Sequence, residues 1–174
     1  MSRPKVTPTG VERTWPETDL IVSKTDPRGV ITYANETFCR VAQYTDVELV
    51  GRSQNIVRHP DMPRCIFQLL WETIAAGEEM FAYIVNLAKS GDHYWVFAHV
   101  TPSFDAAGRI VGYHSSRRAP RRDAVDKAAA LYRELRAAEA SRPDPKSGMA
   151  AGRAMLDAHL KTAGVAYDEY IFLF

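Results

Sequence analysis

Apolar and polar residues follow the two-residue period of β-strands over much of the second half of the chain. Three such segments are separated by turn residues rich in glycine and aspartate: residues 80–87, 93–101 and 109–115. In the middle segment Tyr94 and Val96 face one way, and Trp95 and Phe97 face the other. Both faces of this strand are therefore apolar, and both need to be covered.

Two short β-prone runs precede this region. Residues 20–22 and 30–33 flank the sequence Asp26-Pro27-Arg28-Gly29, in which proline and glycine supply the backbone angles of a turn. The pattern predicts a hairpin.

Helical spacing occupies the stretch between the hairpin and the three later strands. Asn35 suits the N-cap of a short helix over 35–43, and a second turn covers 47–51. The clearest helix is 63–76, which has proline in its first turn and one apolar stripe: Ile66, Phe67, Leu70, Trp71 and Ile74. The element order predicts an α+β domain of about 100 residues, with a five-stranded antiparallel sheet and helices on one face.

The predicted domain runs over residues 19–120, between two extensions of different character. Residues 1–18 contain four prolines and no apolar period, so we expect a flexible N-terminal arm. Residues 121–174 are expected to form C-terminal helices and an apolar tail. The helix predicted at 123–140 carries a short heptad seam (Val125, Ala128, Tyr132 and Leu135). A linker at 141–148, a last helix at 150–163 and the apolar end at 170–174 follow.

Charge and composition narrow the possible partners. The chain has 22 basic and 21 acidic residues, which gives no reason to expect nucleic acid or an anionic membrane. No apolar run approaches the roughly 20 residues of a membrane-spanning helix. Cys39 and Cys65 are too few for a disulfide framework, and residues 1–5 do not resemble a signal segment. We expect a soluble cytoplasmic protein.

Three motifs carry a family resemblance. Residues 31–38 (ITYANETF) resemble the I-x-x-x-N-x-x-F segment of PAS domains. The strings RHPDMP at 58–63 and GDHYWV at 91–96 resemble the PAS domain of bacterial aerotaxis receptors, which holds FAD non-covalently. The resemblance covers about residues 20–120 and implies the sheet order 2-1-5-4-3.

The resemblance also implies a flavin site between the sheet and the short helices. Arg58, His59 and Asp61 are expected to help form it, and a guanidinium suits an anionic pyrophosphate or a reduced, anionic ring. Asp61 also suits a helix cap. Further residues in matching positions are expected to line the site: Asn35, Phe67, Trp71, Asn86 and Tyr94. An apolar slot with a few convergent polar groups is the usual environment of such a ligand.

The sequence departs from the family in the third strand. Met80 stands where these receptors tend to have tryptophan, Phe81 and Ala82 replace small residues, and Leu87-Ala88 replaces a basic pair. These changes affect the expected flavin affinity and the choice between FAD and FMN. They also support an alternative in which the PAS domain binds no cofactor and acts as a dimerising scaffold.

Two other sensor chemistries are known for domains of this kind. Beside the flavin-binding sensor and the cofactor-free scaffold, a third possibility is a gas sensor that holds haem through His59 or His99. The five histidines do not have the spacing of zinc ligands, so a structural zinc site is not expected. Blue-light photoreceptors of this fold form a flavin adduct on a cysteine, but Gln54 stands in that place here, which excludes the adduct.

The leading interpretation is a flavin-binding sensor of redox state or oxygen. No nucleophile elbow, phosphate loop or kinase signature is present, so we do not expect an enzyme. A signalling protein in trans is the expected partner. Self-association is expected through the 123–140 helix, the sheet face with Trp95 and Phe97, or the C-terminal tail.

Overall fold

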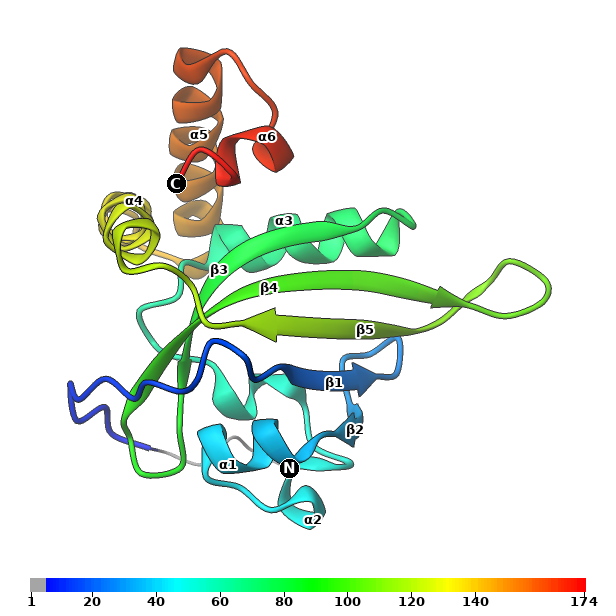
Figure 1. The fold of residues 1–174 in the computed structure, drawn as a ribbon. Helices are drawn as coiled ribbons and strands as arrows, with labels where there is room; N and C mark the ends of the chain where they lie inside the picture. Colours follow the sequence, from blue (N-terminus) through cyan, green and yellow to red (C-terminus); the bar gives the residue numbers. More distant parts are fainter. Residues whose placement is uncertain (1–5) are drawn as a thin grey trace. The chain divides into compact units, whose positions relative to one another are not determined.

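Residues 6–174 are described by the computed structural model, in which five strands form one antiparallel sheet (Figure 1). The spatial order is β2-β1-β5-β4-β3, as predicted. The strands are β1 (Ile21–Thr25), β2 (Ile31–Ala34), β3 (Met80–Leu87), β4 (His93–Phe104) and β5 (Ile110–Arg118). The predicted bounds of β3 are confirmed, whereas β4 and β5 both continue beyond their predicted ends at 101 and 115.

Strand register places each side chain on one of two faces. Tyr94 pairs with Asn86 on β3, and Ala98 lies between Ala82 and Arg117. The next pairing places Ile21 of β1 on the same face. We call this the inner face, and it includes Ile21, Ser23, Ile84, Asn86, Tyr94, Val96, Ala98, Ser115 and Arg117.

The opposite, outer face carries an aromatic cluster. The rings of Phe81 and His99 stack at a centroid distance of 4.1 Å, and Phe97 lies 4.7 Å from Tyr83. Trp95 alternates with Tyr94 along β4 and belongs to this face, as predicted. Tyr83 is buried, while Phe81, Trp95 and Phe97 are half-buried.

Three short helices follow β2 in the sequence and precede the longer helix that leads to β3. They are α1 (Glu36–Ala42), α2 (Asp46–Leu49) and the 3-10 helix η1 (Gln54–Val57). Helix α1 contacts β1, and its buried Phe38 lies beneath Arg117 of the inner face. Thr45 and Glu48 form a reciprocal capping box that starts α2.

The chain divides into two compact units. The first contains the residues up to Pro60 together with Thr73–Pro120, and the second contains Asp61–Glu72 and Arg121–Phe174. Helix α3 (Arg64–Ala75) begins in the second unit and ends in the first. Within residues 6–174, no helix combines the length and apolar character needed to cross a membrane.

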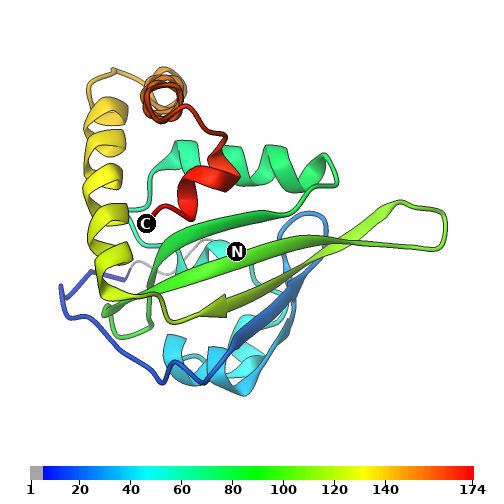
Figure 2. The ribbon, with the colours of Figure 1, turned by 45° about the horizontal axis from the view of Figure 1, so that its top comes forward.

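The second unit is built around a close crossing of two helices, α4 (Arg122–Ala140) and α5 (Pro145–Ala163). Figure 2 shows α5 nearly end-on beside the C-terminal end of α4. A Cβ atom added at Gly148 would lie 2.5 Å from the carbonyl oxygen of Glu139, so glycine permits this approach. The short helix α6 (Tyr167–Ile171), which the sequence pattern did not reveal, follows.

One expectation about this unit needs correction. The linker ends at 144 rather than 148, because Asp144 accepts hydrogen bonds from the backbone N–H groups of Lys146 and Ser147 and starts α5. Pro145 in the first turn was an available signal for this start. The residues of the predicted seam of α4 are all buried: Val125, Ala128, Tyr132 and Leu135.

Part of the expected N-terminal arm is hydrogen-bonded to the sheet. Arg13 donates its backbone N–H to the carbonyl of His93 at 2.7 Å, and His93 donates to Val11 at 2.9 Å. Thr9 donates to the carbonyl of Gly91 at 2.8 Å. Residues 1–5 lie outside the described part of the chain.

Candidate functional site

The two sequence motifs, far apart in the chain, meet at the edge of the sheet. Arg58 forms an isolated antiparallel bridge with Asn86 of β3. The ring of His59 lies edge-on to that of His93, with 5.8 Å between the centroids. Both His59 and Asn86 are buried. The structure therefore brings Arg58 and His59 against the strands that carry Asn86 and Tyr94.

Asn35 ties α1 to the sheet. Its Oδ1 accepts hydrogen bonds from the backbone N–H groups of Phe38 and Val22, both at 3.0 Å. Its Nδ2 donates to the carbonyl of Leu20 at 2.7 Å. The predicted N-cap is confirmed, and these contacts give Asn35 a structural task beside the one that the family resemblance implies.

Arg117 is the charged residue that sequence reasoning missed. It lies on the inner face with 4% of its surface exposed. Its Nε donates to the hydroxyl of Ser115 at 2.9 Å, and its Nη2 donates to the hydroxyl of Ser23. The guanidinium carbon lies 4.8 Å from the centre of the Phe38 ring, a cation–π arrangement.

Two buried polar atoms of the inner face lack hydrogen-bond partners in the described part of the chain. They are Nη1 of Arg117 and the hydroxyl of Tyr94, which is fully buried. Burial lowers the pKa of Arg117 to about 10, and Tyr94 acts in the opposite sense. Burial also raises the pKa of Tyr94, so this hydroxyl stays neutral and can donate.

Three predicted site residues belong to the second unit, together with the C-terminal helices. The carboxylate of Asp61 pairs with Arg136 of α4 at 2.6 Å and is 55% exposed. Trp71 is exposed, and Phe67 is half-buried. Helix α3 receives a side-chain capping contact from a distant residue, because the backbone N–H of Cys65 donates to Glu139.

His99, one of the two candidates for a haem ligand, is engaged on the outer face. Nε2 of His99 lies 2.5 Å from Glu79, and its ring stacks on Phe81 of the outer face, so haem at His99 would have to displace both partners. In residues 6–174, no group of three or more His, Cys, Asp or Glu side chains is placed to hold a metal ion.

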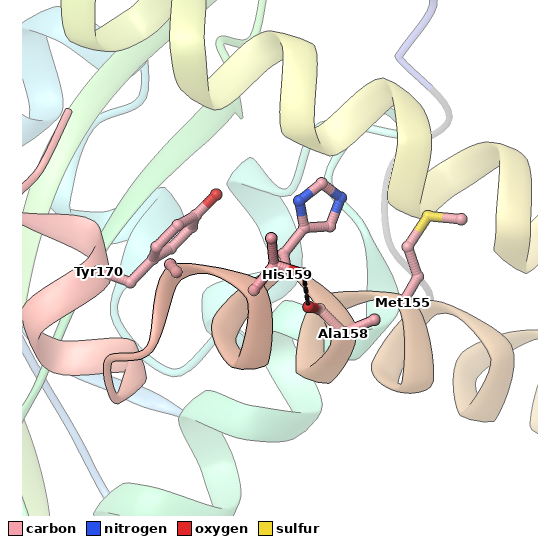
Figure 3. Close-up of a pocket in the computed structure, with 6 residues that line it drawn as sticks. Met155, Ala158, His159 and Tyr170 are labelled. Carbon is pink, nitrogen blue, oxygen red and sulfur yellow. Dashed lines mark hydrogen bonds between the residues drawn. The ribbon is translucent and has the colours of Figure 1, made fainter.

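The second unit also has an open surface hollow between α5 and α6. Met155, Ala158, His159 and Tyr170 line it (Figure 3). His159 pairs with Glu134 at 3.0 Å, and the hydroxyl of Thr162 donates to the carbonyl of Ala158 at 2.9 Å. His159 and Thr162 are thus already engaged in hydrogen bonds, and we assign no function to this hollow.

Comparisons with known proteins agree with the fold. The sequence pattern of a family described as PAS fold matches residues 19–114. The aerotaxis receptor of Escherichia coli (strain K12) is 40% identical over 122 residues, which is 70% of this chain and 24% of the receptor. The nitrogen fixation regulatory protein of Klebsiella pneumoniae is 29% identical over 102 residues, 59% of this chain and 21% of that protein.

The chain thus spans about a quarter or less of the length of these curated relatives. Among solved structures, the dark structure of the blue-light photoreceptor Aureochrome1 LOV is similar with a TM-score of 0.57. That likeness covers 66% of this chain and 85% of the other, at 21% identity. It supports the fold alone.

Proposed function

The chain belongs to the PAS fold family, and from this premise we propose that it is a sensor domain that binds a flavin and passes a redox or oxygen signal to another protein. The observation that carries the proposal is the attachment of Arg58 and His59 to the strands of Asn86 and His93. Arg58, His59 and His93 come from the two motifs that resemble the FAD-binding domain of aerotaxis receptors. The similarity to the Escherichia coli aerotaxis receptor supports the same ligand class.

The residues of the inner face fit a flavin ring. Val96, Ala98 and Ile84 are buried and supply apolar surface for a planar ligand. Arg117 and Tyr94 each present a buried polar atom without a partner in residues 6–174, which suits the carbonyl and nitrogen acceptors of the ring. The proposed ligand is FAD, with FMN as the alternative.

A bound flavin would supply reversible electron transfer. The protein's part is to hold the ring on the inner face, to present donors to it and to respond to its charge. Strand β5, which carries Arg117, ends at Arg118, and α4 begins at Arg122. We propose that a change at β5 biases this helix and so reaches a partner in trans.

The experiment that tests the ligand is an absorption spectrum of protein purified with excess FAD. Flavin bands support the proposal, a Soret band would indicate haem, and neither would favour the cofactor-free scaffold. Arg58→Ala is expected to weaken FAD binding about ten- to hundred-fold, because it removes a charge-assisted contact of about 1.5–3 kcal/mol. Arg64→Ala, at the exposed first residue of α3, is the matched control and should bind like wild type.

If Arg58→Ala keeps full affinity at native stability, the assignment of Arg58 is wrong. Asp61→Ala removes an exposed ion pair with Arg136 and should cost less than about 1 kcal/mol of stability. Thermal unfolding with and without FAD separates an effect on binding from one on folding.

Self-association is proposed through the outer face, since the seam of α4 is buried. The half-buried rings of Phe81, Trp95 and Phe97 offer apolar surface there. Light scattering tests it: a mass near 19.5 kDa at high protein concentration would show a monomer and reject the dimer.

A further inference from the structure

Arg117 is the one arginine or lysine among residues 6–174 that is buried. Its contacts are two serine hydroxyls and the ring of Phe38. In the described part of the chain, no carboxylate forms an ion pair with it. A buried cation of this kind is costly unless it is paired, since its hydration is lost.

The partners within the protein compensate only part of this cost. Hydroxyl groups are neutral, and a cation–π contact contributes about 0.5–2 kcal/mol. Nη1 of Arg117 donates to no group in residues 6–174. The pKa of Arg117, which burial lowers to about 10, still leaves the group charged at neutral pH. The inner face therefore holds a positive charge and a free donor that a bound group could satisfy.

Tyr94 adds a second donor to the same environment. Its hydroxyl is buried without a partner in residues 6–174. Burial raises the pKa of Tyr94, and the positive charge of Arg117 acts in the opposite sense. A diphosphate carries at least two negative charges and is strongly hydrated, so a single buried cation matches it poorly. A ring edge with carbonyl oxygens and at most one negative charge matches one guanidinium and one phenol.

We propose that Arg117 and Tyr94 form the donor pair for the carbonyl edge of the flavin ring, and that Arg117 favours the reduced, negatively charged ring over the oxidised one. This inference rests on the proposed flavin function. It adds the residues whose interaction with the flavin ring depends on the charge of the ring. Ser23 holds the guanidinium in place, because its hydroxyl accepts from Arg117 and donates to Gln54 at 3.4 Å.

The first test compares Arg117→Met with Arg118→Met. Arg118 is the next residue of β5 and is exposed, so it is a matched control for loss of one arginine from this strand. Arg117→Met should lower FAD affinity about ten- to hundred-fold. It should also shift the midpoint potential of the bound flavin to more negative values, since the reduced ring loses more binding than the oxidised ring. Arg118→Met should change neither quantity.

The melting temperature of the FAD-free protein distinguishes a ligand-binding role of Arg117 from a purely structural role. A structural role predicts that Arg117→Met lowers this temperature. Removing an uncompensated buried charge should leave the melting temperature of the FAD-free protein unchanged or raise it. If Arg117→Met lowers this temperature while flavin affinity and potential stay as in wild type, Arg117 is a structural residue and the proposal is overturned.

Tyr94→Phe keeps the test informative if Arg117→Met fails to fold. It removes only an unpartnered hydroxyl, so the FAD-free protein should be equally stable or more stable, while FAD affinity falls several-fold. Unchanged affinity in Tyr94→Phe would overturn the donor pair. Wild-type protein without flavin bands would overturn the proposed function and this inference together. If wild-type protein binds FAD and both Arg117→Met and Tyr94→Phe bind it equally well, this inference alone is overturned.

Discussion

The side-chain carboxylate of Glu139 accepts a hydrogen bond from the backbone N–H of Cys65 at 2.8 Å. Cys65 lies in the first turn of α3, and Glu139 lies near the end of α4, 74 positions away in the chain. Helix N-termini leave their first N–H groups without partners inside the helix. A residue of another helix thus supplies a hydrogen-bond acceptor to the first turn of α3.

Glu139→Ala should destabilise the protein by about 1 kcal/mol, the usual cost of a lost N-terminal cap. Glu139→Gln keeps an oxygen acceptor at the same place and should lose less. Urea unfolding of the two variants beside wild type measures the difference. Equal losses in both would show that the negative charge of Glu139, and not its acceptor, stabilises this helix end.

The two cysteines should differ in reactivity. Burial, followed by the hydrogen bond and charge of Glu139, raises the pKa of the Cys65 thiol to about 12. Cys39 is half-buried, and burial raises its pKa as well. Because the thiolate is the reactive form, a thiol reagent at pH 8 should label Cys39 first and Cys65 only when the protein opens. Cys39→Ser should remove the first phase, and labelling of Cys65 at the same rate as Cys39 would contradict the burial of Cys65.

Gly91 should be intolerant of substitution for two reasons that can be separated. Its φ of +96° is strained for other residues, and an added Cβ would lie 2.2 Å from the carbonyl oxygen of Thr7. Gly108 has φ +75° with nothing within 4 Å, so Gly108→Ala measures the backbone cost alone, about 1–2 kcal/mol.

Gly91→Ala should lose more stability than Gly108→Ala and should release the arm residues beside it. Limited trypsin digestion is expected to cut at Arg13 faster in Gly91→Ala than in Gly108→Ala. The same cleavage rate and the same loss of stability in both variants would mean that the arm does not press on Gly91.

His114 should contribute to loss of stability in mild acid. Its pKa is lowered by burial first and then by the positive charges of Lys24, His99 and Arg117. Below pH 6.5 the unfolded chain therefore binds a proton at His114 more readily than the folded protein does, and stability falls as the pH falls. Between pH 7.5 and 5.5, His114→Gln should lose less free energy of unfolding than wild type. An equal loss in both proteins would contradict the lowered pKa.

The C-terminal tail contains one anchored and one exposed residue of similar size. Ile171 is fully buried, whereas Leu173 is 61% exposed. Ile171→Ala should destabilise the protein by about 2–5 kcal/mol, and Leu173→Ala should change its stability by less than about 0.5 kcal/mol. Thermal unfolding at low and high protein concentration measures both. A marked loss in Leu173→Ala at high concentration alone would indicate that a second copy covers the tail.

Local signals in the sequence determined most of the sheet. The glycine before β3 and the turn residues after it marked its bounds, and Tyr94 and Trp95 lie on opposite faces as the two-residue period of a strand requires. Asn35 caps α1 because its cap contacts are formed by neighbours in the chain. The motifs at 58–63 and 91–96 also pointed to the right family.

Only the tertiary structure decided which charged residue is buried. The pattern ended the last strand at residue 115, and Arg117 and Arg118 look alike in sequence. Strand β5 continues because it lies between β1 and β4, which hydrogen-bond its backbone on both sides whatever its side chains are. Register then turns Arg117 to the inner face and leaves Arg118 exposed. Strand pairing of this kind joins residues that are distant in the chain, and no local pattern of polar and apolar positions encodes it.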